Sequence, residues 1–584
     1  MSTRPTGDVL PNGGDNVRPR VLTVAVASLS AATIALSAPG STGDAQSRPG
    51  AAPNGPARQS SSVTTLTIGA ADGENWPCSF NPFNPNTYYF SLGITNEELY
   101  YVDTLTGKMT PWLATAYKWS KHDTVLTFSV RKGVKWSNGQ PLTAADVAFT
   151  FNLIKNNPSL DLNSIGSFLT SVKQTSPYQV VMRFNQPAVT DFYYVADQVS
   201  IVPESVWKSI KHPLTYPDSN PVGTGPYLVS HCSPQNIEYV KNPQYWQPGK
   251  PKFDKVELPA ILTNSVANED LANGTAQWGG QSIPNIKSFY LSRNKAYRAW
   301  FPAVGVNGLY INLKAPLLSN VAVRRAMAYG VDRNKIAVLA EFNEQPAANQ
   351  AAVLLPLQKQ WLNAALYKKY NYTYDPAKAV SVLEKAGFKR GPDGIFRSPS
   401  GQELSFTVAD VGAYSDQVAS VGIFASEMRQ IGIKLAQQNL STPAMSSELA
   451  SGHFQIAYGG PPQLSVDGPY GILRGILYSP SAVPVGKTAA SDYERFYSPH
   501  ENALFAQLGH TTNVATEEAI IRQLQVPMLQ DVPFIPLTEA TGQDEFNTSY
   551  ASGWPTPSNP YANPSPTTQP DEGVVLLNLV PKKA

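Results

Sequence analysis

The sequence predicts an α/β protein with more than one lobe, and three observations support this fold class. The chain has 584 residues, which is too many for a single hydrophobic core. Residues 404–435 read as strand, helix and strand, an alternation typical of α/β folds. Residues 125–130 alternate apolar and polar side chains, as a half-buried strand does, and a capped helix follows them.

The composition favours a soluble globular protein and disfavours nucleic-acid binding. Charged residues make up 15% of the chain and hydrophobic residues 42%, with a mean hydropathy of −0.23. The formal net charge of +2 is too small to attract a polyanion. The 50 Pro and 28 Tyr residues suit a loop-rich extracytoplasmic protein with aromatic contact surfaces.

The first 62 residues read as a targeting segment and a linker. Arg4, Arg18 and Arg20 precede an apolar run that ends in small residues, which predicts a secretory signal peptide over residues 1–38. The alternative is an uncleaved anchor, although the run is short and polar for a transmembrane helix. Residues 39–62 are rich in Pro, Gly, Ala and Ser and predict a disordered linker. We therefore expect an exported protein, periplasmic or extracellular at the cell surface.

Residues 110–151 form the best-defined stretch of the sequence. They read in order as a helical turn, a strand, a tight turn and a helix. The turn is Asn138-Gly139, a pair that accepts positive φ. Thr143 is the expected N-cap of the helix, and Asp146 completes a capping box with it.

The rest of the chain alternates strands with capped helices. Asp332 is an expected N-cap, Asp375-Pro376 opens a further helix, and Gly387 ends it. A helix over 516–529 is expected to bend or end near Pro527. The expected strands are 64–69, 178–184, 304–312, 404–408, 433–435 and 533–537, and the other expected helices lie within 320–342, 375–387 and 414–430.

An ordered string of motifs carries a family resemblance. It comprises Leu113-Ala114, Trp119, Arg131, Trp136, Asn138-Gly139, Thr143 to Val147, Gly223 to Tyr227 and Asn242 to Trp246. This order resembles the signature of family-5 extracellular solute-binding proteins, the oligopeptide, nickel and oligosaccharide receptors of ATP-binding-cassette importers. The resemblance extends from about Thr64 to the C-terminus, so it is far more specific than one short motif.

The resemblance implies a periplasmic-binding-protein-like α/β fold with three lobes. Lobe I is discontinuous and comprises residues 63–108, 221–309 and 530–584. Lobe II is an inserted subdomain of residues 109–220, and lobe III comprises residues 310–529. Strands that cross between lobes would act as hinges near 307–313 and 531–537. Such a protein binds a solute between its lobes as a monomer and passes it to a membrane permease, with no cofactor and no catalysis.

A solute-binding cleft needs aromatic walls and a few polar groups. The candidate ligand-binding residues are Trp76, Phe83, Tyr89, Trp278, Gln281, Tyr458, Asp467 and Trp554. Core packing is the alternative for each aromatic residue. Trp278 and Trp554 are favoured because small or turn-forming residues flank them, whereas Trp112, Trp119, Trp136 and Trp246 are assigned to packing.

The class of solute depends on one departure from the family. Peptide receptors of this family carry a tryptophan-x-x-aspartate motif in the third lobe, whose aspartate pairs with the ligand's ammonium group. Residues 455–470 lack that tryptophan and first aspartate, and only Asp467 is left as a candidate acid. The C-terminal stretch from Trp554 to Tyr561 is similar to that of the oligosaccharide-binding members. A peptide receptor is placed first, because the family mostly serves peptides, and an oligosaccharide receptor second.

The cysteines and the lack of catalytic motifs bear on the remaining alternatives. In an exported protein Cys78 and Cys232 are expected to form a disulfide, and two buried free thiols are the alternative. The six His residues show no zinc-site spacing, and there is no G-x-S-x-G nucleophile motif. A secreted hydrolase therefore remains a distant alternative, which a reactive Ser or carboxylate pair in a cleft would identify. An adhesion or sensor module built on the same scaffold is a further alternative.

Overall fold

The computed structural model describes residues 64–582 apart from 71–74, 85–90, 371, 462–467, 480–482, 490 and 512. The expected signal peptide and linker, and the candidate residues Tyr89 and Asp467, therefore lie outside the described residues. We keep the names lobe I, lobe II and lobe III for the segments defined above. Among the described residues no helix is long and apolar enough to cross a membrane.

Lobe I is built from segments that are distant in the sequence. β1 pairs in parallel with β10, with Leu66 opposite Val256. The larger sheet has the order β1 (Thr65–Thr67), β10 (Lys255–Pro259), β9 (Asn236–Lys241) and β8 (Tyr227–Ser233). A smaller sheet has the order β11 (Trp278–Gly279), β20 (Glu545–Asn547) and β12 (Tyr297–Ala299). The remaining elements are α4 (Asn264–Asn273), α14 (Asp571–Asn578) and the strand pairs β2 (Tyr100–Asp103) with β3 (Lys108–Pro111) and β21 (Ala551–Ser552) with β22 (Val580–Pro581).

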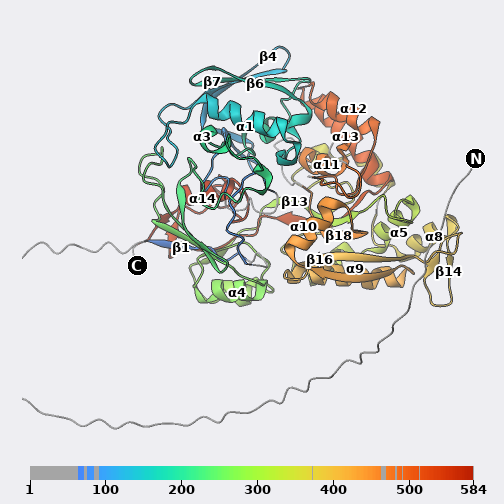
Figure 1. Cartoon of the computed structure of the whole chain (residues 1–584). Helices are drawn as coiled ribbons and strands as arrows, with labels where there is room; N and C mark the ends of the chain where they lie inside the picture. The colour runs from blue at the N-terminus through green and yellow to red at the C-terminus, as the bar shows by residue number, and fades with distance from the viewer. Residues whose placement is uncertain are drawn as a thin grey trace, which may run out of the picture. The chain divides into compact units, whose positions relative to one another are not determined.

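Lobe II is a four-stranded antiparallel sheet covered by a helix. The sheet has the order β4 (Ala114–Ser120), β5 (Val125–Val130), β7 (Gln179–Phe184) and β6 (Leu169–Ser176), and its helices are α1 (Ala144–Asn156), α2 (Phe192–Ala196) and α3 (Glu204–Trp207). Figure 1 shows α1 lying along this sheet. The expected capping box is confirmed, because Thr143 Oγ1 accepts from the Ala145 N–H at 3.2 Å while the Thr143 N–H donates to Asp146 Oδ2 at 2.9 Å.

One local expectation in lobe II was wrong. The segment read as a helical turn forms β4, which pairs with β5 along its length, with Trp119 opposite Leu126. The residues Ala114–Ser120 include several β-branched and aromatic side chains, which suit a pleated surface. Pairing with β5 satisfies the backbone hydrogen-bonding groups of this segment, so its strand conformation is determined by a tertiary contact.

Lobe III and two strands that enter it from the lobe I segments form a five-stranded mixed sheet with helices around it. The sheet has the order β17 (Lys434–Leu440), β16 (Ser405–Val411), β18 (Ile456–Gly459), β13 (Ala303–Ile311) and β19 (Phe534–Thr541). The other elements are α5 (Val321–Gly330), α6 (Arg333–Leu339), α7 (Ala364–Lys369), α8 (Pro376–Lys385), β14 (Lys389–Arg390), β15 (Phe396–Arg397), α9 (Ser415–Gln430), α10 (Thr442–Ser451), α11 (Tyr470–Leu477), α12 (Pro499–Leu508) and α13 (Val514–Gln530). The predicted alternation of β16, α9 and β17 is confirmed, and β16 and β17 are parallel.

The predicted helix caps of lobe III are also confirmed. The Lys335 N–H donates to Asp332 Oδ1 at 3.1 Å, and the Lys378 N–H donates to Asp375 Oδ1 at 2.9 Å. Helix α13 covers the helix expected over 516–529, and it does not end at Pro527 but continues to Gln530 with that proline inside it. The last turn of that helix therefore survives the loss of one backbone donor.

Two antiparallel strands, β13 and β19, connect lobe I to lobe III (Figure 1). Their register shifts between Asn307 and Gly308. Gln345 Oε1 accepts there from Asn307 Nδ2 at 2.9 Å and from Thr538 Oγ1 at 3.1 Å, so one amide joins both strands at the irregularity.

Lobes I and II share one hydrophobic core, whereas most of lobe III packs separately. The shared core contains Leu66 and Trp278 of lobe I together with Leu126 and Phe151 of lobe II. Three further clusters lie mainly in lobe III, and one of them takes in Tyr194 of lobe II. We therefore treat lobes I and II as one body and lobe III as a second.

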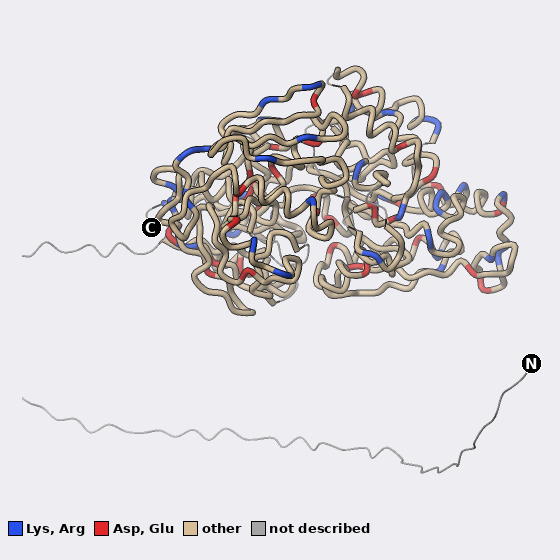
Figure 2. The backbone as a smooth tube through the Cα atoms, turned by 45° about the horizontal axis from the view of Figure 1, so that its top comes forward, with Lys and Arg blue, Asp and Glu red and all other residues tan. Residues whose placement is uncertain are grey.

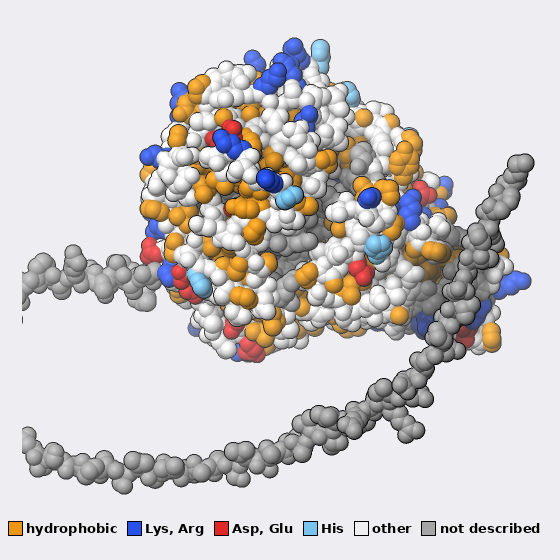
Figure 3. Space-filling view, viewed as in Figure 1, with side chains coloured by type: hydrophobic (Ala, Val, Ile, Leu, Met, Phe, Trp, Pro, Cys, Tyr) orange, Lys and Arg blue, Asp and Glu red, His pale blue; other side chains and the backbone are white. Residues whose placement is uncertain are grey.

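A disulfide and dispersed charges characterise the remaining structure. Cys78 and Cys232 are joined, with an S–S distance of 1.98 Å. Figure 2 shows Lys, Arg, Asp and Glu interspersed along the backbone. Figure 3 shows charged side chains scattered among hydrophobic and uncharged ones on the face it presents.

Candidate functional site

The candidate site is a buried polar region where lobe I meets lobe III. We call it the I–III seam and define it by Gln281, Ser282, Asp544 and Glu545 of lobe I and Glu341, Glu344, Asp416, Ser420 and Tyr458 of lobe III. Asn264 Nδ2 of α4 donates across it to Asp416 Oδ1 at 3.1 Å. The Ile283 N–H also faces the Glu344 carboxyl group from the other lobe.

The seam contains an unusual number of buried carboxyl groups. Glu341 and Glu545 are 0% exposed and Glu344 is 8% exposed. Burial, reinforced by the carboxyl group of Asp416, raises the pKa values of Glu341 and Glu344 to about 8. Burial and the carboxyl groups of Glu344 and Asp544 raise the pKa of Glu545 well above its ordinary value. The charged groups that contribute to these shifts are all carboxylates.

Some polar atoms of the seam lack a hydrogen-bond partner, whereas others face a neighbouring polar group. Among the described residues of the seam, Asp544 Oδ2 and Ser282 Oγ have no hydrogen-bond partner. The Ile283 N–H faces Glu344, the Gln281 N–H faces Glu545, and Ser420 and Thr538 face the Tyr458 hydroxyl. A buried polar group without a partner costs free energy, and most such groups in proteins are satisfied.

Two of the predicted ligand-binding residues, Trp278 and Trp554, are buried in the core next to these acids. Trp278 is 0% exposed, and its Nε1 donates to Asp544 Oδ1 and to the Pro564 carbonyl, both at 3.0 Å. Its ring meets Trp554 edge to face at 5.7 Å, and Trp554 also packs on Phe546 at 5.0 Å. In this structure both indoles belong to the core that holds Asp544 and the strand β20 in place.

The other predicted residues divide into two groups. Gln281 and Tyr458 belong to the seam: Gln281 Nε2 donates to Asn268 Oδ1 at 3.2 Å, and Tyr458 is 3% exposed with the charges of Glu341 and Asp416 acting on it. Trp76 and Phe83 lie elsewhere. Trp76 Nε1 donates to the Leu258 carbonyl at 2.8 Å, and Phe83 packs edge to face on Trp207 at 5.1 Å.

Sequence reasoning missed the acids of the seam. Glu341 and Glu344 follow α6, and Glu545 opens β20, about two hundred positions further along. Glutamate is usually found on protein surfaces, and nothing in the sequence next to these three residues indicates that they are buried. The one available signal was the pair of carboxyl residues in Glu341–Glu344, which sits at the end of a helix where a basic residue would be more usual.

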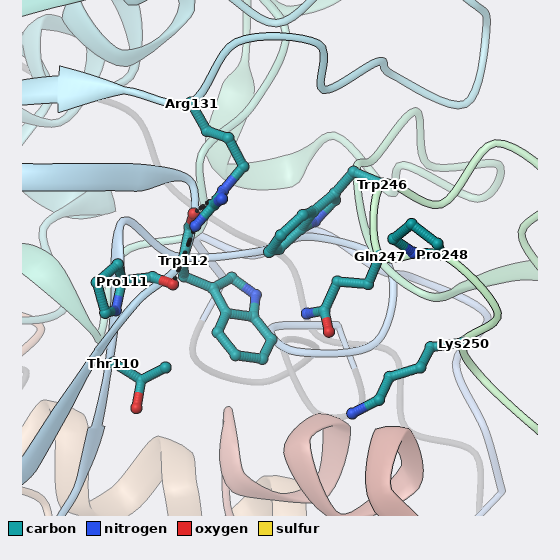
Figure 4. A pocket seen from close by; sticks show the side chains of 8 residues that line it. All are labelled: Thr110, Pro111, Trp112, Arg131, Trp246, Gln247, Pro248 and Lys250. Carbon is teal, nitrogen blue, oxygen red and sulfur yellow. Dashed lines mark hydrogen bonds between the residues drawn. The ribbon is translucent and has the colours of Figure 1, made fainter.

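A separate pocket of about 460 Å³ lies where lobe I meets lobe II (Figure 4). Its lining residues are Thr110, Pro111, Trp112, Arg131, Trp246, Gln247, Pro248 and Lys250. Beneath it Glu97 accepts from Trp112 Nε1 at 2.8 Å and from Trp246 Nε1 at 2.9 Å, and Arg131 stacks on Trp246 at 4.4 Å. Residues of two distant motifs therefore meet around one buried carboxylate, which supports their assignment to packing.

The two bodies, the paired crossing strands and the polar seam define the architecture of a solute-binding protein. Residues 108–474 match the family described as bacterial extracellular solute-binding proteins, family 5 Middle, and the chain belongs to this family. The expected periplasmic-binding-protein fold is thereby confirmed.

The chain is similar to curated and solved members. It is 27% identical over 358 residues to the nickel-binding periplasmic protein of Escherichia coli, covering 58% of this chain and 65% of the relative. It thus spans just under two thirds of that relative. A periplasmic oligopeptide-binding protein of Thermotoga maritima, solved with mannohexaose, has a TM-score of 0.84 at 25% identity over 90% of this chain and 99% of that one. An oligopeptide-binding protein of Bacillus subtilis, solved with a nonapeptide, has a TM-score of 0.74 at 17% identity over 89% of this chain and all of that one, a likeness in fold.

Proposed function

We propose that this chain is the substrate-binding component of an ATP-binding-cassette importer. It would take up an extracytoplasmic solute in the I–III seam and deliver it unchanged to a membrane permease. The observation that carries this proposal is the set of buried polar groups in the seam, contributed by both lobe I and lobe III.

The structure suggests how binding would proceed. Parting of lobe III from lobes I and II about β13 and β19 would open the seam to solvent. A solute that enters would donate hydrogen bonds to the carboxyl groups of Glu341, Glu344 and Glu545. Closure would then bury these groups with partners, and the free energy gained would favour the closed form.

Two solute classes fit this seam. An oligopeptide offers backbone N–H donors and an ammonium group, and relatives of this chain include proteins named as peptide-binding. An oligosaccharide offers many hydroxyl donors, and the Thermotoga maritima neighbour was solved with a bound hexasaccharide. We place peptides first and oligosaccharides second.

The proposal includes no catalytic step. A hydrolase would need a nucleophile with its base, or carboxyl groups placed on either side of a scissile bond. The family consists of solute-binding proteins, and the acids of the seam are buried together. We further propose that the protein is exported through its N-terminal segment and acts as a monomer in the periplasm or at the cell surface.

Thermal unfolding of the full chain against peptide and oligosaccharide libraries tests the proposal. A solute that binds the native state raises the unfolding midpoint, and the shift grows with the logarithm of its concentration above Kd. Mass spectrometry of the recovered solute should show it intact. A lack of stabilisation by either library, or conversion of the bound solute into products, would contradict the proposed function.

A further inference from the structure

We propose that the pocket between lobes I and II, shown in Figure 4, is a second ligand site that binds a small aromatic carboxylate. The carboxylate binds between Arg131 and Lys250, and the ring lies against the indoles of Trp112 and Trp246. We call this site the lobe I–II pocket. None of its lining residues belongs to lobe III or to the I–III seam, so the inference does not depend on the proposed function.

The lobe I–II pocket has the size and the walls of a small-molecule site. Its volume of about 460 Å³ falls within the range of about 300 to 1,000 Å³ that such sites occupy. Pro111, Pro248 and the two indoles supply apolar walls, against which an aromatic ring can stack. Figure 4 shows the side chains of Gln247 and Lys250 extending toward Trp112. A flat ring with a polar group at one edge matches this lining.

The aromatic walls are held in place by the protein itself. Glu97, beneath the pocket, accepts from Trp112 Nε1 at 2.8 Å and from Trp246 Nε1 at 2.9 Å. The two indole rings meet edge to face at 5.8 Å. Arg131 lies over the Trp246 ring at 4.4 Å. Its Nε donates to the Trp112 carbonyl at 2.6 Å, and its Nη2 donates to the Pro111 carbonyl at 3.2 Å. A site that is ordered in advance loses less conformational entropy when a ligand binds.

The charge of the pocket favours an anion. None of the described residues that line it is Asp or Glu, whereas Arg131 and Lys250 are cations. Neither cation forms an ion pair with an acid in the described part of the chain. Among the same residues Arg131 Nη1 has no hydrogen-bond partner, and Lys250 Nζ has one, Asn578 Oδ1 at 3.4 Å. A guanidinium and an ammonium group both bind carboxylates through charge-assisted hydrogen bonds.

Burial makes these two cations less stable than they are in water. It lowers the pKa of Arg131, an effect that the charge of Glu97 opposes. Burial also lowers the pKa of Lys250, and the nearby charge of Lys252 adds to this effect. No carboxyl group of the described residues contributes to the pKa of Lys250. An anion bound beside both groups offsets their lost hydration.

Another cavity of the chain provides a contrast. It lies between lobes II and III, and it also holds an arginine between aromatic rings, Arg474. Asp191 lies there at 3.7 Å from Arg474 Nε, so this guanidinium has an anion of the chain itself. The volume of that cavity is about 140 Å³, which is below the usual range of ligand sites. Only the lobe I–II pocket, of these two, combines room for a ring with cations that lack an acid.

Calorimetric titration of the full chain with three probes at matched ionic strength tests the proposal. The probes are phenylacetate, its neutral isostere phenylacetamide, and inorganic phosphate. Phenylacetate has about ten non-hydrogen atoms and should bind with a Kd of about 1 mM or below, at least about tenfold more tightly than either other probe. No binding of phenylacetate at about 10 mM, or equal binding of phenylacetamide or of phosphate, would overturn the aromatic-carboxylate site.

Charge variants locate the bound carboxylate. Lys250→Gln should weaken phenylacetate binding by about tenfold and leave phenylacetamide within about twofold, and it should keep the fold because Lys250 makes one long hydrogen bond. Arg131→Lys keeps a charge but loses the planar fork, so it should also weaken phenylacetate binding. Lys252→Gln is the matched control: Lys252 is exposed and does not line the pocket, so the affinity should change by less than about twofold. Unchanged phenylacetate binding in Lys250→Gln, or an equal loss in Lys252→Gln, would overturn the proposal.

A variant of the I–III seam separates this site from the proposed function. Asn264→Ala removes the hydrogen bond to Asp416 across the seam and should leave the affinity for phenylacetate within about twofold. An equal loss in Asn264→Ala and Lys250→Gln would place phenylacetate in the seam and overturn the site in the lobe I–II pocket. The library screen decides the proposed function independently, because its solutes bind in the seam.

Discussion

Arg474 of α11 lies beside Asp191 of lobe II, with 3.7 Å between Arg474 Nε and Asp191 Oδ1, and both side chains are 7% exposed. The guanidinium is held between the rings of Tyr194 and Tyr478, at 4.6 and 4.7 Å. Tyr470 also donates to Asp191 Oδ1 at 3.1 Å. This ion pair joins lobe II to lobe III away from the seam.

Arg474→Met should weaken the junction between lobes II and III. It leaves the Asp191 carboxyl group buried without its cation, which typically costs about 3 to 5 kcal/mol. We expect a larger radius of gyration in small-angle X-ray scattering and weaker solute binding, because part of the binding free energy then has to close the lobes. Arg522→Met is the matched control: its pair with Glu518 is partly exposed, so the loss should stay within about 1 kcal/mol. Unchanged scattering and affinity in Arg474→Met would contradict the role of this ion pair.

The disulfide should contribute strongly to stability. Cys78 and Cys232 are 154 positions apart, so the bond closes a long loop in the unfolded chain. Cys78→Ser with Cys232→Ser should lower the free energy of unfolding by about 2 to 5 kcal/mol. Chemical denaturation of the oxidised protein and the double variant measures the difference. Equal stability of the two would show that the bond does not constrain the unfolded chain.

Gly308 should be intolerant of a side chain. A Cβ at this position would lie 2.3 Å from the Ile535 carbonyl and 2.8 Å from the Phe534 ring, within the paired strands that connect the lobes. Gly308→Ala should therefore destabilise the protein by about 1 to 3 kcal/mol. Gly422→Ala in α9 is the control, because its Cβ would find its nearest neighbour at 3.7 Å and Ala favours a helix. Thermal unfolding of both variants measures the difference in stability. A Gly308→Ala variant as stable as the Gly422→Ala control would contradict the predicted clash.

The solute-free protein should be most stable in acid. Burial raises the pKa values of Glu97 and Asp571 to about 7 and that of Glu344 to about 8. A carboxyl group whose pKa is raised by folding contributes stability that is full below its unfolded value and is lost as the pH rises through its folded value. The unfolding midpoint should therefore fall by several degrees between about pH 5 and pH 8. A midpoint that rises over this range would contradict the burial of these acids.

Local features were the most predictable from sequence. Thr143 with Asp146, Asp332 and Asp375 were all predicted as helix caps, because a cap depends on residues within one turn of it. The β16–α9–β17 alternation followed from periodicity over a short window. The strand β4 was missed because its conformation depends on pairing with β5.

The seam could not be predicted because it depends on tertiary contacts. Glu344 and Glu545 come together only after both bodies have folded and the lobes have met. Trp278 was chosen from its flanking residues, yet its indole N–H supports Asp544 from behind. Tyr458 and Gln281, two other candidates from the sequence, lie among the seam residues. Residue type and neighbours therefore indicate aromatic and amide candidates, but not which way they face.

Hydrogen–deuterium exchange of the full chain, with and without a solute that raises its unfolding midpoint, tests the location of the site most directly. The account predicts that added protection concentrates in residues 281–283, 341–345 and 415–420, which supply the two sides of the seam. Protection concentrated instead at residues 110–112 and 246–250 around the lobe I–II pocket, or no change in the seam, would contradict it.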